Sequence, residues 1–184
     1  PRGAHPTLGS LLVAKRETGM KIMTMVRPRE GGFCYTEGEF AVAVEDAKLL
    51  LSHGADGLVF GFLHSDGTLD AERTKILTDL ALSAGKEAVF HRAIDVTADW
   101  RGTLDALIGL GDTRVLTNGQ APDVSQAADT VREMIAYAAG RIEILPGAGI
   151  TRRNMERVIR ESGCSQIHLA AHKAQIDPSV NNNR

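Results

Sequence analysis

The chain has 184 residues, of which 43% are hydrophobic and 24% are charged, a balance that is typical of a single folded domain. A formal net charge of -2 gives no electrostatic reason to expect nucleic acid or an anionic membrane surface as the partner. Apolar runs are too short for a membrane span, which needs roughly 20 residues, and the N-terminus lacks a secretion-signal pattern. We therefore expect one domain over residues 1–184, a cytoplasmic location, and a small molecule or a metal as the ligand.

Six short runs rich in β-branched residues have the length of strands, and amphipathic helical patterns lie between them. The predicted strands cover residues 21–27, 57–63, 86–90, 113–117, 141–145 and 166–170. Thr36 and Glu39 form a capping-box pattern, while Pro122-Asp123 and Thr151 mark later helix starts. A glycine precedes every predicted strand and is expected to end a helix in the left-handed conformation, namely Gly19, Gly54, Gly85, Gly111, Gly140 and Gly163.

Regular alternation of strand and helix predicts parallel strands joined by right-handed crossovers. That leaves a closed barrel or an open doubly wound sheet. The open sheet is disfavoured because no G-x-G-x-x-G motif follows the first strand. We therefore predict an α/β fold of the TIM-type (β/α)8 barrel. Six strands do not close such a barrel, so either residues are absent or a partner covers the edges.

The two cysteines, Cys34 and Cys164, lie far apart and lack Cys-x-x-Cys spacing, so neither a zinc site nor a disulfide framework is indicated. The chain opens at Pro1 and enters a helical pattern almost at once. We expect from this that it is a fragment whose beginning is missing.

The active site of a (β/α)8 barrel lies at the carboxyl ends of its strands, so the residues after each strand are the site candidates. After the first predicted strand come Arg27 and Arg29, separated by a proline. The planar guanidinium group binds a carboxylate or phosphate through two parallel hydrogen bonds. The alternative is a structural ion pair with a carboxylate of a neighbouring strand.

After the third predicted strand come His91, Arg92 and Asp95. A carboxylate can orient an imidazole, and the imidazole can then move a proton near neutral pH. This pattern makes the three residues candidates for catalysis. In the alternative interpretation, Asp95 caps the helix that follows Val96.

After the fourth predicted strand come Thr117 and Asn118, and after the fifth comes a loop that contains Gly147, Ala148 and Gly149. Glycines allow a close approach to the backbone, and amides at the start of a helix favour an anion. These residues are therefore predicted to bind an anion. The alternative is a tight turn that needs glycine only for its geometry.

Metal-ligand spacing is weak along the whole chain. His168 and His172 are four residues apart, and Cys34 lies in a glycine-rich loop beside Tyr35. A metal pair or a reactive thiol is one interpretation of these residues. Polar surface residues and a free loop cysteine are the other, so the metal ligands are left unassigned.

Several strings, taken together and in order, resemble the CutC copper homeostasis family. The string MVRPREGGFCYTEGEF resembles the family's arginine-proline-arginine loop, ADGLVFGFL resembles its fourth strand, and VFHRAID resembles its fifth. The strings RVLTNGQ, ILPGAGIT and the histidine of QIHLAA match the sixth, seventh and eighth strands.

The resemblance implies a cytosolic barrel that is often oligomeric and is associated with copper(I). It aligns GAHPTLG with the loop after the second strand, so strand 1, helix 1 and strand 2 would be lacking here. The cysteines that the family is thought to use for copper would lie in that stretch, where soft thiolates suit copper(I). The last strand departs from the family, because Ala170-Ala171-His172 replaces a more usual serine-alanine pattern.

Three hypotheses remain open. The chain is a copper-handling protein of the CutC type, or an enzyme that acts on a small anionic or sugar-like substrate at the strand ends. In the third, it is an interaction module whose exposed strand edges find another subunit. We expect a homo-oligomer without nucleic acid or membrane partners, and whether the chain is an enzyme is left undecided.

Overall fold

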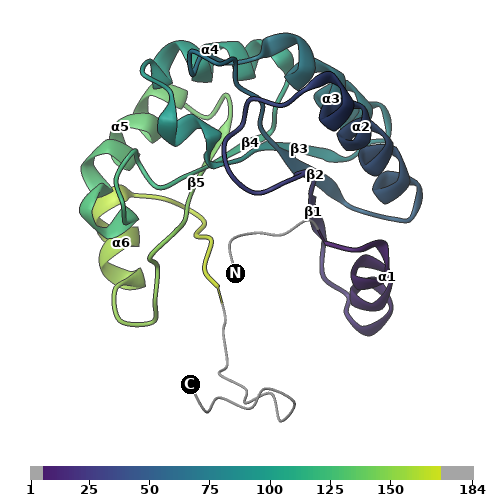
Figure 1. The fold of residues 1–184 in the computed structure, drawn as a ribbon. Helices are drawn as coiled ribbons and strands as arrows, with labels where there is room; N and C mark the ends of the chain where they lie inside the picture. The colour runs from purple at the N-terminus through teal and green to yellow at the C-terminus, as the bar shows by residue number, and fades with distance from the viewer. Residues whose placement is uncertain (1–5, 171–184) are drawn as a thin grey trace, which may run out of the picture.

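The computed structural model describes residues 6–170, which form a five-stranded parallel sheet with helices on one side (Figure 1). The strands are neighbours in sequence order: β1 (Met23–Met25), β2 (Gly57–Phe60), β3 (Glu87–Phe90), β4 (Arg114–Thr117) and β5 (Glu143–Pro146). The helices are α1 (Leu8–Glu17), α2 (Glu37–Ser52), α3 (Ala71–Ser83), α4 (Trp100–Leu110), α5 (Ala128–Ala138) and α6 (Met155–Ser162). Two 3-10 helices, η1 (Arg92–Val96) and η2 (Val124–Gln126), follow β3 and β4.

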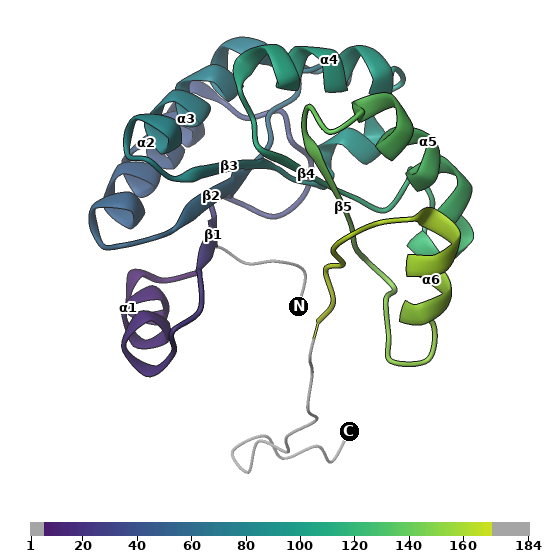
Figure 2. The same ribbon diagram turned by 180° about the vertical axis from the view of Figure 1, so that it is seen from behind.

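The sheet is curved, and its two faces are unlike. Figures 1 and 2 show α2 to α6 in an arc along the convex face, while no helix of the described residues covers the concave face. The strands follow sequence order and every crossover helix lies on the same side, which differs from a doubly wound sheet, where helices cover both faces. The structure therefore shows an α/β fold with five parallel strands.

The hydrophobic core lies between the convex face of the sheet and the helices. Leu58, Phe60 and Ala88 are fully buried against residues of α2 and α3, and Val115 and Ile144 belong to a second buried cluster with residues of α4, α5 and α6. Burial of this apolar area is the main force that holds the helices on the sheet. Among the described helices, none has both the length and the apolarity needed to cross a membrane.

Side chains of a strand alternate between its two faces, so the residues that lie next to the buried core residues along each strand point to the concave side. Met25, Val59, Val89, Arg114 and Glu143 are paired across the five strands in register. Counting two residues at a time from these positions identifies the concave-facing residue at the carboxyl end of each strand. They are Arg27, Gly61, His91, Asn118 and Gly147.

The structure confirms the first five predicted strands, although they are shorter than expected, and it confirms the capping box between Thr36 and Glu39. The sixth predicted strand, over residues 166–170, is wrong: only His168 makes a bridge, to Gly147. Gly19 does not have a positive φ, because α1 ends at Glu17 and Thr18 is extended. The five other cap glycines do have a positive φ.

Two predicted helix starts need correction. Asp123 caps the short η2 through Ser125, and α5 begins only at Ala128. Thr151 precedes a turn, and α6 begins at Met155. In both places a polar residue with its own local hydrogen bond starts a turn before the helix, which sequence patterns do not separate from a cap.

Candidate functional site

His91 is a buried imidazole at the end of β3. It is 3% exposed, and its Nδ1 accepts a hydrogen bond from the Ala93 amide at 3.2 Å. Gly61 makes room for the ring, because a Cβ at that position would come within 2.4 Å of the imidazole. The Phe33 ring lies on it at a centroid distance of 4.8 Å.

The environment of His91 fixes its protonation state. Burial lowers the pKa of His91 to about 3, and Arg27 and Arg92 contribute in the same direction. The ring is therefore neutral at physiological pH, unlike the group expected to move a proton near neutrality. Because Nδ1 accepts, the single proton is on Nε2, and that buried N–H has no hydrogen-bond partner among the described residues.

Asp95 organises the end of β4 rather than the imidazole. Its carboxylate accepts hydrogen bonds from the Asn118 amide at 3.0 and 3.1 Å and from the Thr117 hydroxyl, and it pairs with Arg92 at 3.0 Å. The alternative role as cap of the following helix is also not observed, because Asp99 caps α4. Thr117 itself is on the convex side against Met134.

Asn118 is the second buried polar side chain that faces the concave side. It is 3% exposed, and its backbone amide is held by Asp95. Its side-chain Oδ1 is buried without a hydrogen-bond partner in the described part of the chain. An oxygen in this position can accept a hydrogen bond from a ligand.

The two arginines after β1 have different roles. Arg29 pairs with Glu39 at 2.6 Å and donates to the carbonyl oxygens of Gly32 and Cys34 at 3.2 and 2.7 Å. It therefore shapes the loop after β1, as the ion-pair alternative predicted, but its partner lies in α2 rather than in a strand. Two hydrogen bonds from Thr36, together with the Arg29 ion pair, hold the pKa of Glu39 below its usual value.

Arg27 has no carboxylate partner among residues 6–170. One terminal nitrogen donates to the Gly31 carbonyl at 2.7 Å, and the guanidinium lies over Phe33 at 5.2 Å. Its Nε is buried without a hydrogen-bond partner in the same range of residues. The Tyr35 ring lies nearby, and burial raises the pKa of Tyr35 while Arg27 acts in the opposite direction.

The loop after β5 has the geometry of a tight turn. Ala148 and Gly149 both have positive φ, 72° and 77°, and a Cβ on Gly149 would meet the Asp123 carboxylate at 2.1 Å. The Gly147 amide is used in a bond to the Thr117 carbonyl at 2.8 Å. A carboxylate beside Gly149 disfavours an anion there, so this geometry favours the alternative given for the loop.

A cavity of about 200 Å³ nevertheless opens beside this loop. Arg92, Ala148, Gly149 and His168 are among its lining residues. Arg92 uses its Nε for Asp95, and its side chain is 44% exposed. The cavity therefore brings together one predicted catalytic residue and two residues of the predicted anion loop.

No soft-metal cluster forms in the described part of the chain. Cys34 is exposed after β1, whereas Cys164 is buried, and residues 6–170 contain no group of three His, Cys, Asp or Glu suited to a metal. His172, half of the possible histidine pair, lies outside the described residues. Copper(I) as a cargo would need soft donors that these residues do not bring together.

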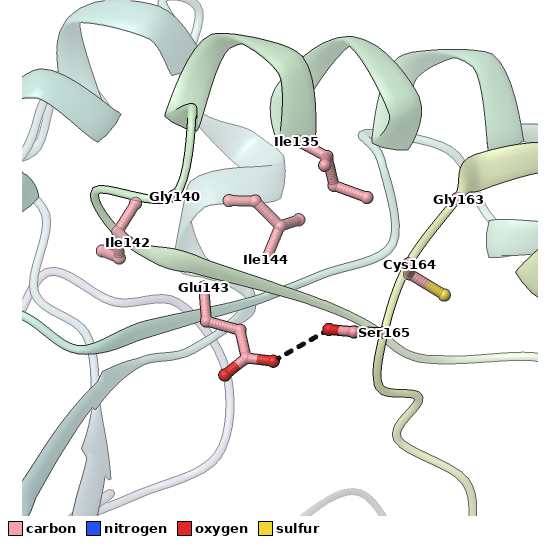
Figure 3. A pocket seen from close by; sticks show the side chains of 8 residues that line it. All are labelled: Ile135, Gly140, Ile142, Glu143, Ile144, Gly163, Cys164 and Ser165. Carbon is pink, nitrogen blue, oxygen red and sulfur yellow. Dashed lines mark hydrogen bonds between the residues drawn. The ribbon is translucent and has the colours of Figure 1, made fainter.

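Cys164 lines a different cavity, of about 380 Å³, beside the amino end of β5. Figure 3 shows the Cys164 thiol pointing away from Ile144, and it shows the neighbouring Ser165, whose hydroxyl donates a hydrogen bond to Glu143 at 3.3 Å. Because Glu143 starts β5 and Gly147 follows its end, this cavity is at the opposite end of the strands from His91. It is separate from the candidate site.

The sequence patterns gave no role to Phe33 or Gly61. Phe33 contacts both Arg27 and His91, and Gly61 provides the space that the imidazole occupies. The available signal was an aromatic residue in a glycine-rich loop and a glycine inside a predicted strand, where a close approach is common.

A sequence model of the CutC family matches residues 2–173. This chain belongs to the CutC family. It is 51% identical over 181 residues to a family protein CutC of Treponema denticola. The aligned region covers 98% of this chain and 73% of the relative. The human copper homeostasis protein cutC homolog is 37% identical over 173 residues, or 94% of this chain and 63% of the relative. This CutC family chain thus spans 63 to 73% of the length of these two relatives.

Two solved structures resemble the chain. The putative copper homeostasis protein CutC from Streptococcus agalactiae gives a TM-score of 0.85 at 32% identity and covers 91% of this chain and 82% of its own. A protein described as QR15, an aldolase, gives a TM-score of 0.66 at 17% identity over 85% of this chain and 72% of its own. The second likeness shows the fold alone.

Proposed function

We propose that this CutC family chain serves copper homeostasis in the cytoplasm, with copper(I) as its cargo. The observation that carries this proposal is the family match over residues 2–173, together with human and mouse relatives named for copper homeostasis. The chain covers 63% of each of those two relatives, so the activity belongs to the whole protein. We propose a homo-oligomer as the working form, which light scattering of the purified protein tests.

We also propose that the five parallel strands belong to a larger, closed sheet. These strands would be consecutive members of a closed (β/α)8 barrel whose strand 1, helix 1 and strand 2 are not part of this chain. The order of the strands, the helices on one face and the likeness to an aldolase support it. In a crystal structure of a full-length relative, we expect further strands to pair with the equivalents of β1 and β5 and to close the sheet. An open sheet in that structure would contradict the proposed barrel.

Copper(I) titration into the reduced protein tests the copper proposal. The described residues offer two separated thiols, so we expect weak binding by this chain and stoichiometric binding by the longer T. denticola relative. Cys34→Ser and Cys164→Ser are matched variants, and neither should abolish binding by itself. The absence of copper(I) binding by the longer relative would refute the proposal.

A second candidate function is binding of a small anionic substrate at the carboxyl ends of the strands. One specific observation favours it: Arg27 Nε, His91 Nε2 and Asn118 Oδ1 are buried at the ends of β1, β3 and β4 without hydrogen-bond partners in the described chain. A buried polar group that lacks a partner costs roughly 1–3 kcal/mol, and a ligand that pairs with it recovers that energy.

This site is tested by binding of carboxylates and inorganic phosphate, followed by NMR. We expect resonance changes at the ends of β1, β3 and β4, and loss of these changes in His91→Ala. If an enzyme reaction is found, the same variant should abolish turnover. Full activity in His91→Ala would contradict a role for these strand ends.

A further inference from the structure

Arg27 carries the one positive charge of these strand ends that no described carboxylate offsets. Arg29 is paired with Glu39, and Arg92 is paired with Asp95. Arg27 instead contacts a carbonyl oxygen and the face of Phe33. Because an uncompensated, half-buried guanidinium is costly, a single negative charge is the complement that this position lacks.

His91 adds a neutral donor next to this charge. Its Nδ1 is used by Ala93, so Nε2–H is fixed as the free donor. The ring contacts Phe33, which also lies against the Arg27 guanidinium, so one aromatic side chain covers both groups. A planar carboxylate has two oxygens, one for a guanidinium N–H and one for an imidazole N–H.

Asn118 supplies an acceptor from the neighbouring strand. Its Oδ1 is buried without a partner among the described residues, and Asp95 fixes its backbone. A carboxylate cannot satisfy an acceptor, whereas a hydroxyl can donate to it. A ligand that reaches all three groups therefore carries a hydrogen-bond donor in addition to its negative charge.

We propose that Arg27, His91 and Asn118 bind a small hydroxycarboxylate, with Arg27 and His91 on the carboxylate and Asn118 on the hydroxyl. This inference deepens the proposed anionic site and rests on it. The ligand takes the place of the Phe33 ring. The backbone of that residue is tethered through its carbonyl to the Leu63 amide at 3.0 Å, so a side-chain rotation is enough.

Equilibrium binding of glycolate, acetate and inorganic phosphate to the whole chain tests the proposal. We expect glycolate to bind with a stoichiometry of one and about tenfold more tightly than acetate, which lacks the hydroxyl. Arg27→Gln should weaken glycolate binding by at least about tenfold. The matched control Arg160→Gln, at an exposed position of α6, should leave it unchanged.

Two variants separate donation from folding at His91. His91→Gln keeps a neutral N–H donor and should retain most of the glycolate affinity, whereas His91→Leu should lose at least about tenfold. The unfolding midpoint of each variant is measured in parallel. In the wild type, long-range proton–nitrogen NMR should report the Nε2–H tautomer and a shift of this signal with glycolate.

The outcomes distinguish this inference from the function on which it rests. Phosphate binding that exceeds glycolate binding and survives Arg27→Gln would overturn the hydroxycarboxylate and leave an anionic site elsewhere at the strand ends. Glycolate binding that is equal in His91→Leu and wild type would overturn the role of His91. If none of the three anions binds, both the inference and the anionic function fail.

Discussion

Asp112, in the turn between α4 and β4, is a buried carboxyl group whose ionisation should destabilise the fold. It is 3% exposed, and its Oδ2 lies 3.1 Å from the Thr78 hydroxyl. That hydroxyl has one proton and also lies 3.0 Å from the Thr74 carbonyl, which only accepts. A protonated Asp112 can donate to Thr78, whereas an ionised one competes with the carbonyl. Burial accordingly raises the pKa of Asp112 from 3.8 to about 7.

The direction of the pH effect follows from this raised pKa. Between the usual pKa of 3.8 and the folded-state pKa of about 7, the folded state binds more protons than the unfolded state. The free energy of unfolding therefore falls as the pH rises through this range. The stability contributed by protonated Asp112 is lost once the pH passes about 7. A rise of about three pKa units corresponds to roughly 4 kcal/mol at most, of which roughly 2–3 kcal/mol is lost between about pH 5 and pH 8.

Asp112→Asn isolates this effect, because the amide can donate to Thr78 and does not titrate. Urea unfolding at about pH 5 and pH 8 should show that the variant lacks the decline of the wild type and is more stable at pH 8 by roughly 2–4 kcal/mol. Asp79→Asn, at an exposed pair with Lys75, is the control and should keep the wild-type decline. If the variant keeps the pH dependence of the wild type, Asp112 is not the group whose ionisation destabilises the fold.

Two further substitutions test the loops around the site. Gly149→Ala should lower the free energy of unfolding by roughly 1–3 kcal/mol, because the residue has a left-handed φ and its Cβ would meet Asp123; unchanged urea unfolding would contradict this. Arg29→Met should speed amide exchange in residues 30–35 by about tenfold, because the loop loses its ion pair with Glu39 and two hydrogen bonds to carbonyl oxygens. Hydrogen-exchange mass spectrometry measures this rate. Protection equal to that of the wild type would show that Arg29 does not order the loop.

The order and type of the elements could be predicted from sequence because each strand is a compact apolar run that is followed by an amphipathic helix. The chemistry of the site was less accessible. The sequence offers the same two interpretations for Arg27 and Arg29, and only the structure shows that Glu39 pairs with Arg29. An ion pair between a loop and the next helix has no pattern in the sequence.

The protonation state of His91 could not be predicted from the sequence. A histidine followed by an arginine and a carboxylate predicts a proton-transfer group, yet its pKa depends on burial under Phe33 and against Gly61. These contacts are set by packing between three strand ends. The failed strand at residues 166–170 has a similar cause, because a β-branched run forms a strand only where a neighbour pairs with it along its length.

The most direct test of the strand-end site is a crystal structure of this chain soaked in glycolate and copper(I), with diffraction recorded at the copper edge. We expect density for one glycolate within hydrogen-bond distance of Arg27 and His91, the Phe33 ring turned aside, and no anomalous peak among these residues. A Phe33 ring that stays in place over an empty cluster, or an anomalous copper peak beside His91, would contradict it.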